Sequence, residues 1–242
     1  MRSSPELAFL LLNFCVLVLA AGGLLAQPDE LAEKRRRMVV EQIEARGVSD
    51  SRVLAAMARV PRHLFVPEAY RQQAYDDYPL PIGSNQTISQ PYVVALMTSL
   101  LGLEGGERVL EVGTGSGYQA AVLGEIAAEV YTIEILEPLA ERAAATLSAL
   151  GYGNVTVRAD DGWSGWPAHA PFDGILVTAA PERVPEPLLE QLKVGARLVI
   201  PVGSFFQDLL VYTRTANGYE KRNVIPVRFV PMTGRAESRE RP

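Results

Sequence analysis

The sequence predicts an α/β protein with a doubly wound, mostly parallel, Rossmann-like sheet, preceded by helices and followed by a β-hairpin. Three observations support this prediction. Short apolar runs alternate with helical patterns from residue 103 onward, and a glycine-rich loop follows the first run. Near the end of the chain, two β-rich runs flank the turn signal Asn217-Gly218. The continuous apolar character of the earlier runs is typical of strands buried on both faces.

The elements can be placed along the chain from turn and capping signals. A first helix is expected over residues 29–46, because Gly47 follows a run of helical spacing. A second helix is capped by Ser49 or Asp50 and ends at Pro61, and a third extends from Pro91 to Gly102. Strands are predicted at 108–112, 130–134, 155–159, 174–179 and 197–202, and further helices at 118–127, 138–150 and 185–192.

The segment between the second and third helices is irregular. Pro67, Pro79, Pro81 and Gly83 interrupt it and predict loops or short turns. Long irregular segments inside compact domains are often functional. We therefore expect residues 76–90 to form a binding element.

The N-terminus carries an apolar run at residues 7–26, which predicts either a cleaved signal peptide or a membrane anchor. Membrane contact is expected through this run. The basic cluster at residues 34–37 favours a cytoplasmic location for the residues after the run, by the positive-inside rule. Export to the periplasm is the alternative, and synthesis that begins at Met38 is a third interpretation.

The rest of the chain, residues 27–242, has the length and composition of one domain, which we expect to be monomeric. We divide it into a helical and loop region (27–102), a core of alternating strands and helices (103–203) and C-terminal strands (204–242).

Charge and residue usage argue against several classes of protein. The net charge of -5 disfavours a nucleic-acid binder, because phosphate contacts need a dense basic surface. Cys15 is the only cysteine, so the chain can form no internal disulfide. The two histidines, His63 and His169, are far apart in the sequence, so we predict no metal site and structural or surface roles for both.

A glycine-rich loop, Glu111-Val-Gly113-Thr-Gly115-Ser-Gly117, lies between a predicted strand and a predicted helix. Glycines there permit a sharp turn and let the backbone approach a ligand at the helix N-terminus. The GxGxG spacing differs from the GxGxxG of dinucleotide sites, which weakens a nicotinamide interpretation. A purely structural turn is the alternative.

Acidic residues follow the next two predicted strands. Glu134 comes 21 positions after Gly113, where a carboxylate can accept hydrogen bonds from ribose hydroxyls; a solvated glutamate is the alternative. Asp161 is our candidate acceptor for an adenine amino group, Gly162 allows close approach, and Trp163 could shield the ring. The alternative is an Asp-Gly turn beside a core tryptophan.

Several blocks in the same order resemble the protein-L-isoaspartate O-methyltransferases, within the class I S-adenosylmethionine-dependent methyltransferases. They are VPRHLFVPEAY, PIGSNQTISQPYVVALMTSLL, LEVGTGSGYQAAVL, DGWSGWPAHAPFDGILVTAAP and VRFVPM, within residues 38–233. The resemblance implies S-adenosyl-L-methionine as cofactor, bound by the glycine loop, Glu111, Glu134 and Asp161. It implies methyl transfer to the carboxylate of L-isoaspartyl residues in damaged proteins and peptides. The ester then cyclises to a succinimide, whose hydrolysis restores part of the material to aspartate.

The resemblance also assigns substrate residues. The family's active-site serine falls on Ser89, and the same block supplies Thr87 and Ile88 as substrate-binding residues. The segment 227–233 borders the peptide in the family and supplies Val230 and Thr233. From the residues alone, Ser89 could equally cap the helix that opens at Pro91. Another small-molecule or protein acceptor on the same fold is the alternative function, which the TISQPY block disfavours.

Overall fold

The computed structural model describes residues 30–238. Within these residues a seven-stranded sheet has the order β5-β4-β3-β6-β7-β8-β9. Strands β3 to β7 are parallel, whereas β8 and β9 are each antiparallel to the strand before them. The predicted α/β fold class is confirmed. The strands are β3 (Arg108–Val112), β4 (Glu129–Glu134), β5 (Val155–Ala159), β6 (Phe172–Val177), β7 (Leu192–Val202), β8 (Gln207–Thr215) and β9 (Gly218–Val227).

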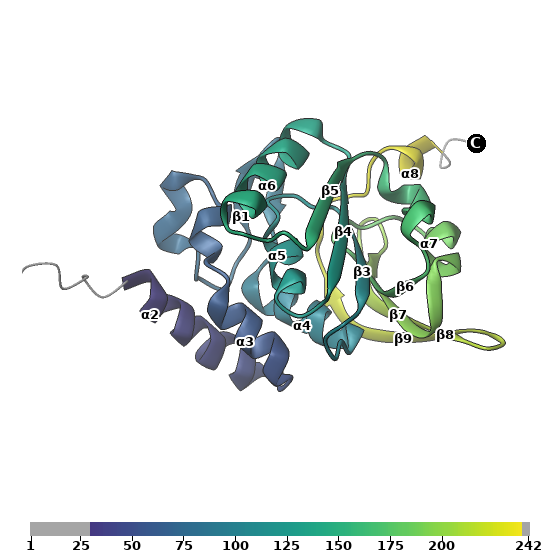
Figure 1. Cartoon of the computed structure of the whole chain (residues 1–242), viewed down its shortest axis with the longest axis horizontal. Helices are drawn as coiled ribbons and strands as arrows, with labels where there is room; N and C mark the ends of the chain where they lie inside the picture. The colour runs from purple at the N-terminus through teal and green to yellow at the C-terminus, as the bar shows by residue number, and fades with distance from the viewer. Residues whose placement is uncertain (1–29, 239–242) are drawn as a thin grey trace, which may run out of the picture.

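Helices cover both faces of the sheet, because successive strand residues point to opposite sides. Val109 joins the hydrophobic cluster on one face and Leu110 the cluster on the other. Figure 1 shows α2 to α6 on one side of the strands and α7 and α8 on the other. These helices are α2 (Glu30–Arg37), α3 (Ser51–Arg59), α4 (Pro91–Leu101), α5 (Tyr118–Gly124), α6 (Glu137–Ala149), α7 (Glu186–Glu190) and α8 (Arg235–Ser238).

The first predicted helix is present over residues 30–46 but changes its winding. Helix α2 continues into a π-helical segment η1 (Met38–Ile43) and a 3₁₀ segment η2 (Glu44–Arg46). Gly47 ends it in the left-handed region at φ +93°. The side chain of Asp50, not Ser49, caps α3 by accepting from the backbone N–H groups of the next turn.

The segment 76–90 is more ordered than a loop, which corrects the sequence prediction. Strands β1 (Leu80–Gly83) and β2 (Gln86–Ile88) form an antiparallel hairpin. The turn residues Ser84 and Asn85 both have positive φ, +52° and +56°. That is the backbone of a two-residue turn whose twist matches a hairpin. The sequence signal was weak, because neither turn position is a glycine.

Short 3₁₀ segments complete the connections between the main elements. They are η3 (Arg62–Phe65), η4 (Glu68–Gln73), η5 (Gly162–Ser164) and η6 (Pro167–His169).

Both histidines have structural contacts: His63 Nδ1 lies 2.7 Å from the Tyr75 hydroxyl, and His169 stacks on Tyr131 at 4.0 Å between ring centroids.

Several boundaries differ from prediction at the ends of the last parallel strands. Strand β6 ends at Val177 rather than 179, and the N–H of the next residue, Thr178, makes the last backbone hydrogen bond to β3, to the Val112 carbonyl at 2.9 Å. Strand β7 begins at Leu192, which pairs with Phe172, so α7 stops short of the predicted 192. The start of β7 is set by its pairing with β6, and the local sequence around Leu192 does not indicate it.

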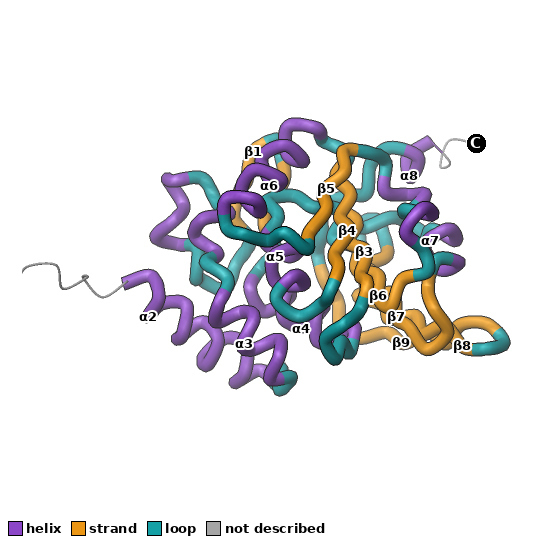
Figure 2. Tube along the Cα trace, viewed as in Figure 1, coloured by secondary structure: helices purple, strands orange, loops and turns teal. Residues whose placement is uncertain are grey.

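The C-terminal hairpin is present as predicted. Strands β8 and β9 pair from Gln207↔Val227 to Thr215↔Gly218. Their turn, Ala216-Asn217, lies one position before the predicted pair and projects from the sheet (Figure 2).

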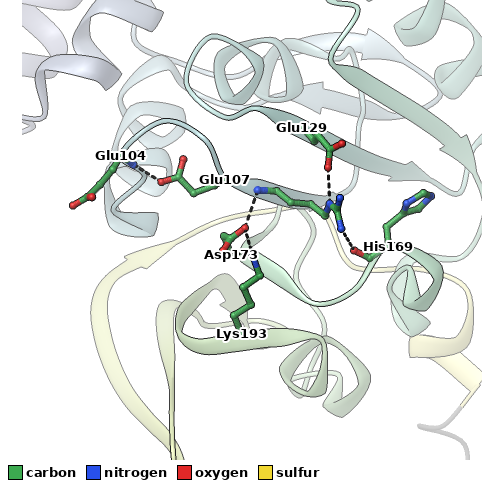
Figure 3. Close-up of polar contacts among 7 residues, drawn as sticks. Glu104, Glu107, Glu129, His169, Asp173 and Lys193 are labelled. Atoms are coloured by element: carbon green, nitrogen blue, oxygen red, sulfur yellow. Dashed lines mark hydrogen bonds and ion pairs between the residues drawn. The ribbon is translucent and has the colours of Figure 1, made fainter.

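The amino ends of the parallel strands are held by polar contacts (Figure 3). Arg108 Nε donates to Glu129 at 2.6 Å, and its backbone N–H donates to Asp173 at 3.0 Å. Lys193 Nζ donates to the same Asp173 carboxylate at 2.8 Å. These contacts tie β3, β4, β6 and β7 together at the edge opposite their carboxyl ends.

Candidate cofactor and substrate site

The glycine loop connects β3 to α5 at the carboxyl edge of the sheet. Gly113, Gly115 and Gly117 all have positive φ, between +54° and +99°. A Cβ on Gly113 would lie 2.3 Å from Thr178 Oγ1 at the end of the neighbouring strand β6. A side chain is therefore excluded at 113 by both backbone conformation and space, and the turn passes close to β6.

Glu134 ends β4 beside this loop and is 6% exposed. Its two carboxylate oxygens each accept one backbone hydrogen bond, from Gly115 N at 2.8 Å and from Leu136 N at 3.0 Å. Each oxygen has further lone pairs. The carboxylate is therefore held in one orientation while it can still accept hydrogen bonds from a ligand.

Asp161 follows β5 and is oriented in the same way. Oδ1 accepts from Trp163 N at 2.9 Å, and Oδ2 accepts from Arg235 N at 2.8 Å. Gly162 packs so closely on β3 that a Cβ there would lie 2.3 Å from the Val112 side chain. Asp161 thus has its two oxygens held from two distant parts of the chain.

One cavity at this edge collects most of the predicted site residues. It encloses about 860 Å³ between its walls, part of it open to solvent. The predicted residues that line it are Thr87, Ile88, Ser89, Gly113, Gly115, Glu134, Asp161, Gly162, Val230 and Thr233. The structure brings the predicted cofactor side and the predicted substrate side into a single cavity.

Three residues lie outside this lining. Glu111 does not line the cavity, whereas its neighbour Val112 on β3 does. The Glu111 side chain is fully buried, and Thr132 Oγ1 donates a hydrogen bond to its Oε2 at 2.5 Å. Gly117 is the N-terminal cap position of α5, and a Cβ there would meet Leu147 of α6 at 3.2 Å. Trp163 is 4% exposed in the core cluster that also contains Ile133, which matches the core-tryptophan alternative.

The carboxyl group of Glu111 is unusual because burial raises its pKa to about 8. Among the described residues, its Oε1 has no hydrogen-bond partner. Thr132 lies 2.6 Å from Thr114, oxygen to oxygen, and Thr114 lines the cavity. Glu111 is therefore connected to Thr114 of the glycine loop by a chain of hydrogen bonds through Thr132.

Ser89 lies at the junction of β2 and α4. Gln90 is the N-cap residue of α4 and makes no side-chain capping bond, and among the described residues no hydrogen bond from the Ser89 side chain to α4 is found. The helix-cap interpretation of Ser89 therefore lacks its contact, and Ser89 lines the cavity.

Arg62 holds the segment that contains Ser89, and the sequence analysis did not predict this role. It is 0% exposed, and its Nη2 donates to the Ser89 carbonyl at 2.7 Å. Its guanidinium lies over the Tyr118 ring at 4.8 Å, and Tyr118 lines the cavity. An arginine in the apolar run VPRHLFV was the available signal, because a buried arginine needs partners.

A second cavity opens beside the first. Both are lined by Thr87, Ser89, Thr178 and Val230. Its outer wall includes Arg46, whose guanidinium stacks over the Tyr92 ring at 3.5 Å, and residues 225–229 of the C-terminal part. The adjoining cavity gives a longer ligand a path from Ser89 to the surface.

The lining chemistry fits an adenosyl ligand beside an anionic one. Glu134 and Asp161 offer acceptors for hydroxyl and amino groups, and the glycine loop offers backbone close to the ligand. Hydroxyl groups of Thr87 and Ser89 are donors suited to a carboxylate. Fold and site together define a Rossmann-like protein of the methyltransferase type, whose predicted cofactor and acceptor residues line one cavity.

The comparisons identify the family. The model for the Protein-L-isoaspartate(D-aspartate) O-methyltransferase family matches residues 33–237, and this chain belongs to that family. It is 58% identical to the protein-L-isoaspartate O-methyltransferase of Gloeobacter violaceus over 198 residues, covering 81% of this chain and 97% of that protein. It is 53% identical to protein-L-isoaspartate O-methyltransferase 2 of Shewanella sediminis, covering 94% and 96%.

Solved structures agree with this assignment. A protein-L-isoaspartate O-methyltransferase superposes with a TM-score of 0.75 at 30% identity, covering 82% of this chain and 66% of that longer one. A putative protein-L-isoaspartate O-methyltransferase from Plasmodium falciparum, in complex with S-adenosyl-L-homocysteine, has a TM-score of 0.71 at 24% identity, covering 82% and 98%. The second likeness shows the fold.

Proposed function

We propose that this protein transfers a methyl group from S-adenosylmethionine to the carboxylate of L-isoaspartyl residues in damaged proteins and peptides. Membership of the family supports the activity. The observation that carries the proposal in this molecule is the single cavity. It is lined by Glu134 and Asp161 on the cofactor side and by Ser89 on the acceptor side.

The residues on the cofactor side hold and orient the adenosyl group. Glu134 accepts hydrogen bonds from the ribose hydroxyls, and Asp161 accepts from the adenine amino group. When bound, S-adenosylmethionine supplies a methyl group on a positively charged sulfur. Because the Gly115 and Leu136 N–H groups already orient the Glu134 carboxylate, binding costs little reorganisation there.

The residues on the acceptor side position a nucleophile that is already charged. A carboxylate is ionised at neutral pH, so no general base is needed to activate it. Ser89 and Thr87 would donate hydrogen bonds that hold and orient the substrate carboxylate beside the bound cofactor. Holding two reactants in such a geometry supplies a large part of a rate enhancement.

Methyl transfer to a matched pair of peptides tests the proposal. We expect incorporation into a peptide with one L-isoaspartyl residue and none above background into the same peptide with normal aspartate. The extra backbone methylene of isoaspartate is what brings its carboxylate to Ser89. Equal methylation of both peptides would contradict the repair function. Methylation of neither, with the cofactor bound, would favour another small-molecule or protein acceptor.

The location of the protein is a separate proposal. Residues 7–26, on which the signal-peptide and anchor interpretations rest, lie outside the described residues. No helix among residues 30–238 is long and apolar enough to cross a membrane. We propose that the catalytic domain is a monomer that faces the cytoplasm, tethered through residues 7–26 or synthesised from Met38. The basic cluster and the cytosolic supply of cofactor support this, although Lys34 and Arg35 also bond within the fold.

Cell fractionation and mass spectrometry of the N-terminus test the location. We expect a cytoplasm-facing protein that begins at Met1 or Met38. A periplasmic protein that begins near Gly23 or Gln27 would contradict it. Sedimentation of the purified domain tests the monomer.

A further inference from the structure

The last part of the described chain crosses the cofactor cavity as a strap, which we define as residues 230–237. At its start, Ala180 N donates to the Val230 carbonyl at 2.8 Å, and Met232 N donates to the Ala180 carbonyl at 2.9 Å. These bonds join the strap to the segment after β6. The strap ends in α8, which in Figure 1 lies on the same side of the sheet as α7.

At its other end the strap is attached to the cofactor side of the cavity. The backbone N–H of Arg235 donates to Asp161 Oδ2 at 2.8 Å, across 74 positions of sequence. The Arg235 side chain also donates from Nη1 to Ser164 Oγ at 2.7 Å. The turn before it needs Gly234 at φ +79°, since a Cβ there would lie 2.7 Å from Asp161 Oδ2 and 2.6 Å from Ile135.

The strap therefore belongs to both halves of the site. Met232 and Thr233 line the cofactor cavity, and Val230 lines both that cavity and the adjoining one. A strap that leaves Asp161 would disturb the candidate adenine acceptor and the wall beside the peptide at the same time. The docked strap therefore forms part of the wall of both cavities.

We infer that the contact between Arg235 N–H and Asp161 is a positioning contact that couples the binding of cofactor and peptide. The inference rests on the proposed function, because it takes Asp161 as the adenine acceptor and the adjoining cavity as the peptide side. Each ligand packs against the docked strap and so favours it. By linkage, each ligand must then raise the affinity of the other by the same factor. We expect a factor on the order of ten.

The backbone donor permits a sharp test. Arg235→Pro removes the N–H, and proline fits the first position of a helix, where Arg235 begins α8. Arg235→Ala keeps the N–H and removes only the side chain. Gly234→Ala keeps the N–H but displaces the turn, and so produces the same defect by another route.

Calorimetry of S-adenosylhomocysteine binding, with and without saturating isoaspartyl peptide, measures the coupling. We expect roughly tenfold tighter binding with peptide in the unmodified protein and in Arg235→Ala. Arg235→Pro and Gly234→Ala should bind the cofactor product more weakly and show no gain from peptide. Thermal unfolding of each variant checks that the fold is retained, because Met232 and Ala236 of the strap are buried.

Each other outcome overturns the inference. Coupling that survives in Arg235→Pro would show that the N–H contact does not carry it. Equal loss in Arg235→Ala and Arg235→Pro would assign the effect to the side chain and Ser164. Cofactor binding without any gain from peptide in the unmodified protein would refute the coupling but leave the proposed function intact. No cofactor binding at all would refute both.

Discussion

The guanidinium of Arg62 donates a 2.7 Å hydrogen bond to the carbonyl oxygen of Ser89, from a side chain with no exposed surface. Its Nε donates to the Ala74 carbonyl, also at 2.7 Å. One buried cation thus holds both ends of the segment that carries the β1–β2 hairpin. Burial lowers the pKa of Arg62 to about 10, so the guanidinium stays protonated at neutral pH.

Replacement of Arg62 should destabilise the protein and slow its turnover. Arg62→Met leaves two carbonyl oxygens without their charged donor, at a cost of about 2–5 kcal/mol in the free energy of unfolding. Arg62→Lys keeps the charge but not the forked geometry, so we expect an intermediate loss. Urea unfolding measures the stability of both variants, and peptide methylation rates measure their turnover. Unfolding of Arg62→Met at the original urea concentration would contradict the role of this contact.

Replacement of Ser89 should slow the reaction without weakening the fold. Loss of one positioning donor typically slows turnover by on the order of a hundredfold. Because the Ser89 side chain does not cap α4, thermal stability should not change. Peptide methylation rates and melting temperatures of Ser89→Ala test this, with exposed Ser148→Ala as the matched control. A lower melting temperature with an unchanged rate would restore the helix-cap interpretation.

Replacement of Glu134 should weaken cofactor binding. Hydrogen bonds to a charged group contribute about 1.5–3 kcal/mol each, so Glu134→Ala should lower the affinity for S-adenosylhomocysteine by roughly 10- to 100-fold. Glu137→Ala removes the same charge from an exposed site three positions away and should bind normally. Calorimetry measures the affinity of both variants for S-adenosylhomocysteine. Unchanged affinity in Glu134→Ala would refute the ribose assignment, and tighter binding of NAD would refute the cofactor class.

Glu111 should make stability depend on pH. Its carboxyl group has a pKa of about 8 in the folded protein, against an ordinary value of 4.5. Between these values the folded state holds a proton that the unfolded chain has lost, so the free energy of unfolding falls as pH rises through this window. The loss should amount to a few kcal/mol. The contribution is fully present below pH 4.5 and is gone above about 8.

Glu111→Gln isolates this effect, because the amide has nearly the same shape and does not titrate. Urea unfolding between pH 4 and 9 should show a shallower decline for the variant, with the largest gain over the unmodified protein at the alkaline end. Parallel curves for the two proteins would show that Glu111 is ionised in the fold.

The sequence by itself determined the parallel core and the edge at which the site lies. Buried strands, the glycine loop and strand-end acids are local signals, and the carboxyl ends of parallel strands meet at one edge. That geometry explains why Glu134 and Asp161 line one cavity, as predicted. The TISQ block located Ser89 through resemblance.

Tertiary structure decided the contacts between segments far apart in the chain. Arg62 reaches Ser89 across 27 positions, and Arg235 reaches Asp161 across 74; no periodicity or capping signal encodes either pairing. Glu111 faces the interior because successive residues of a strand point to opposite faces of the sheet. The sequence motif places Glu111 next to the glycines but does not show which way its side chain points. Local sequence sets which backbone turns are allowed. Only packing of the whole chain decides which donor meets which acceptor, because most buried polar groups find a hydrogen-bond partner and that partner is set by the three-dimensional arrangement of distant segments.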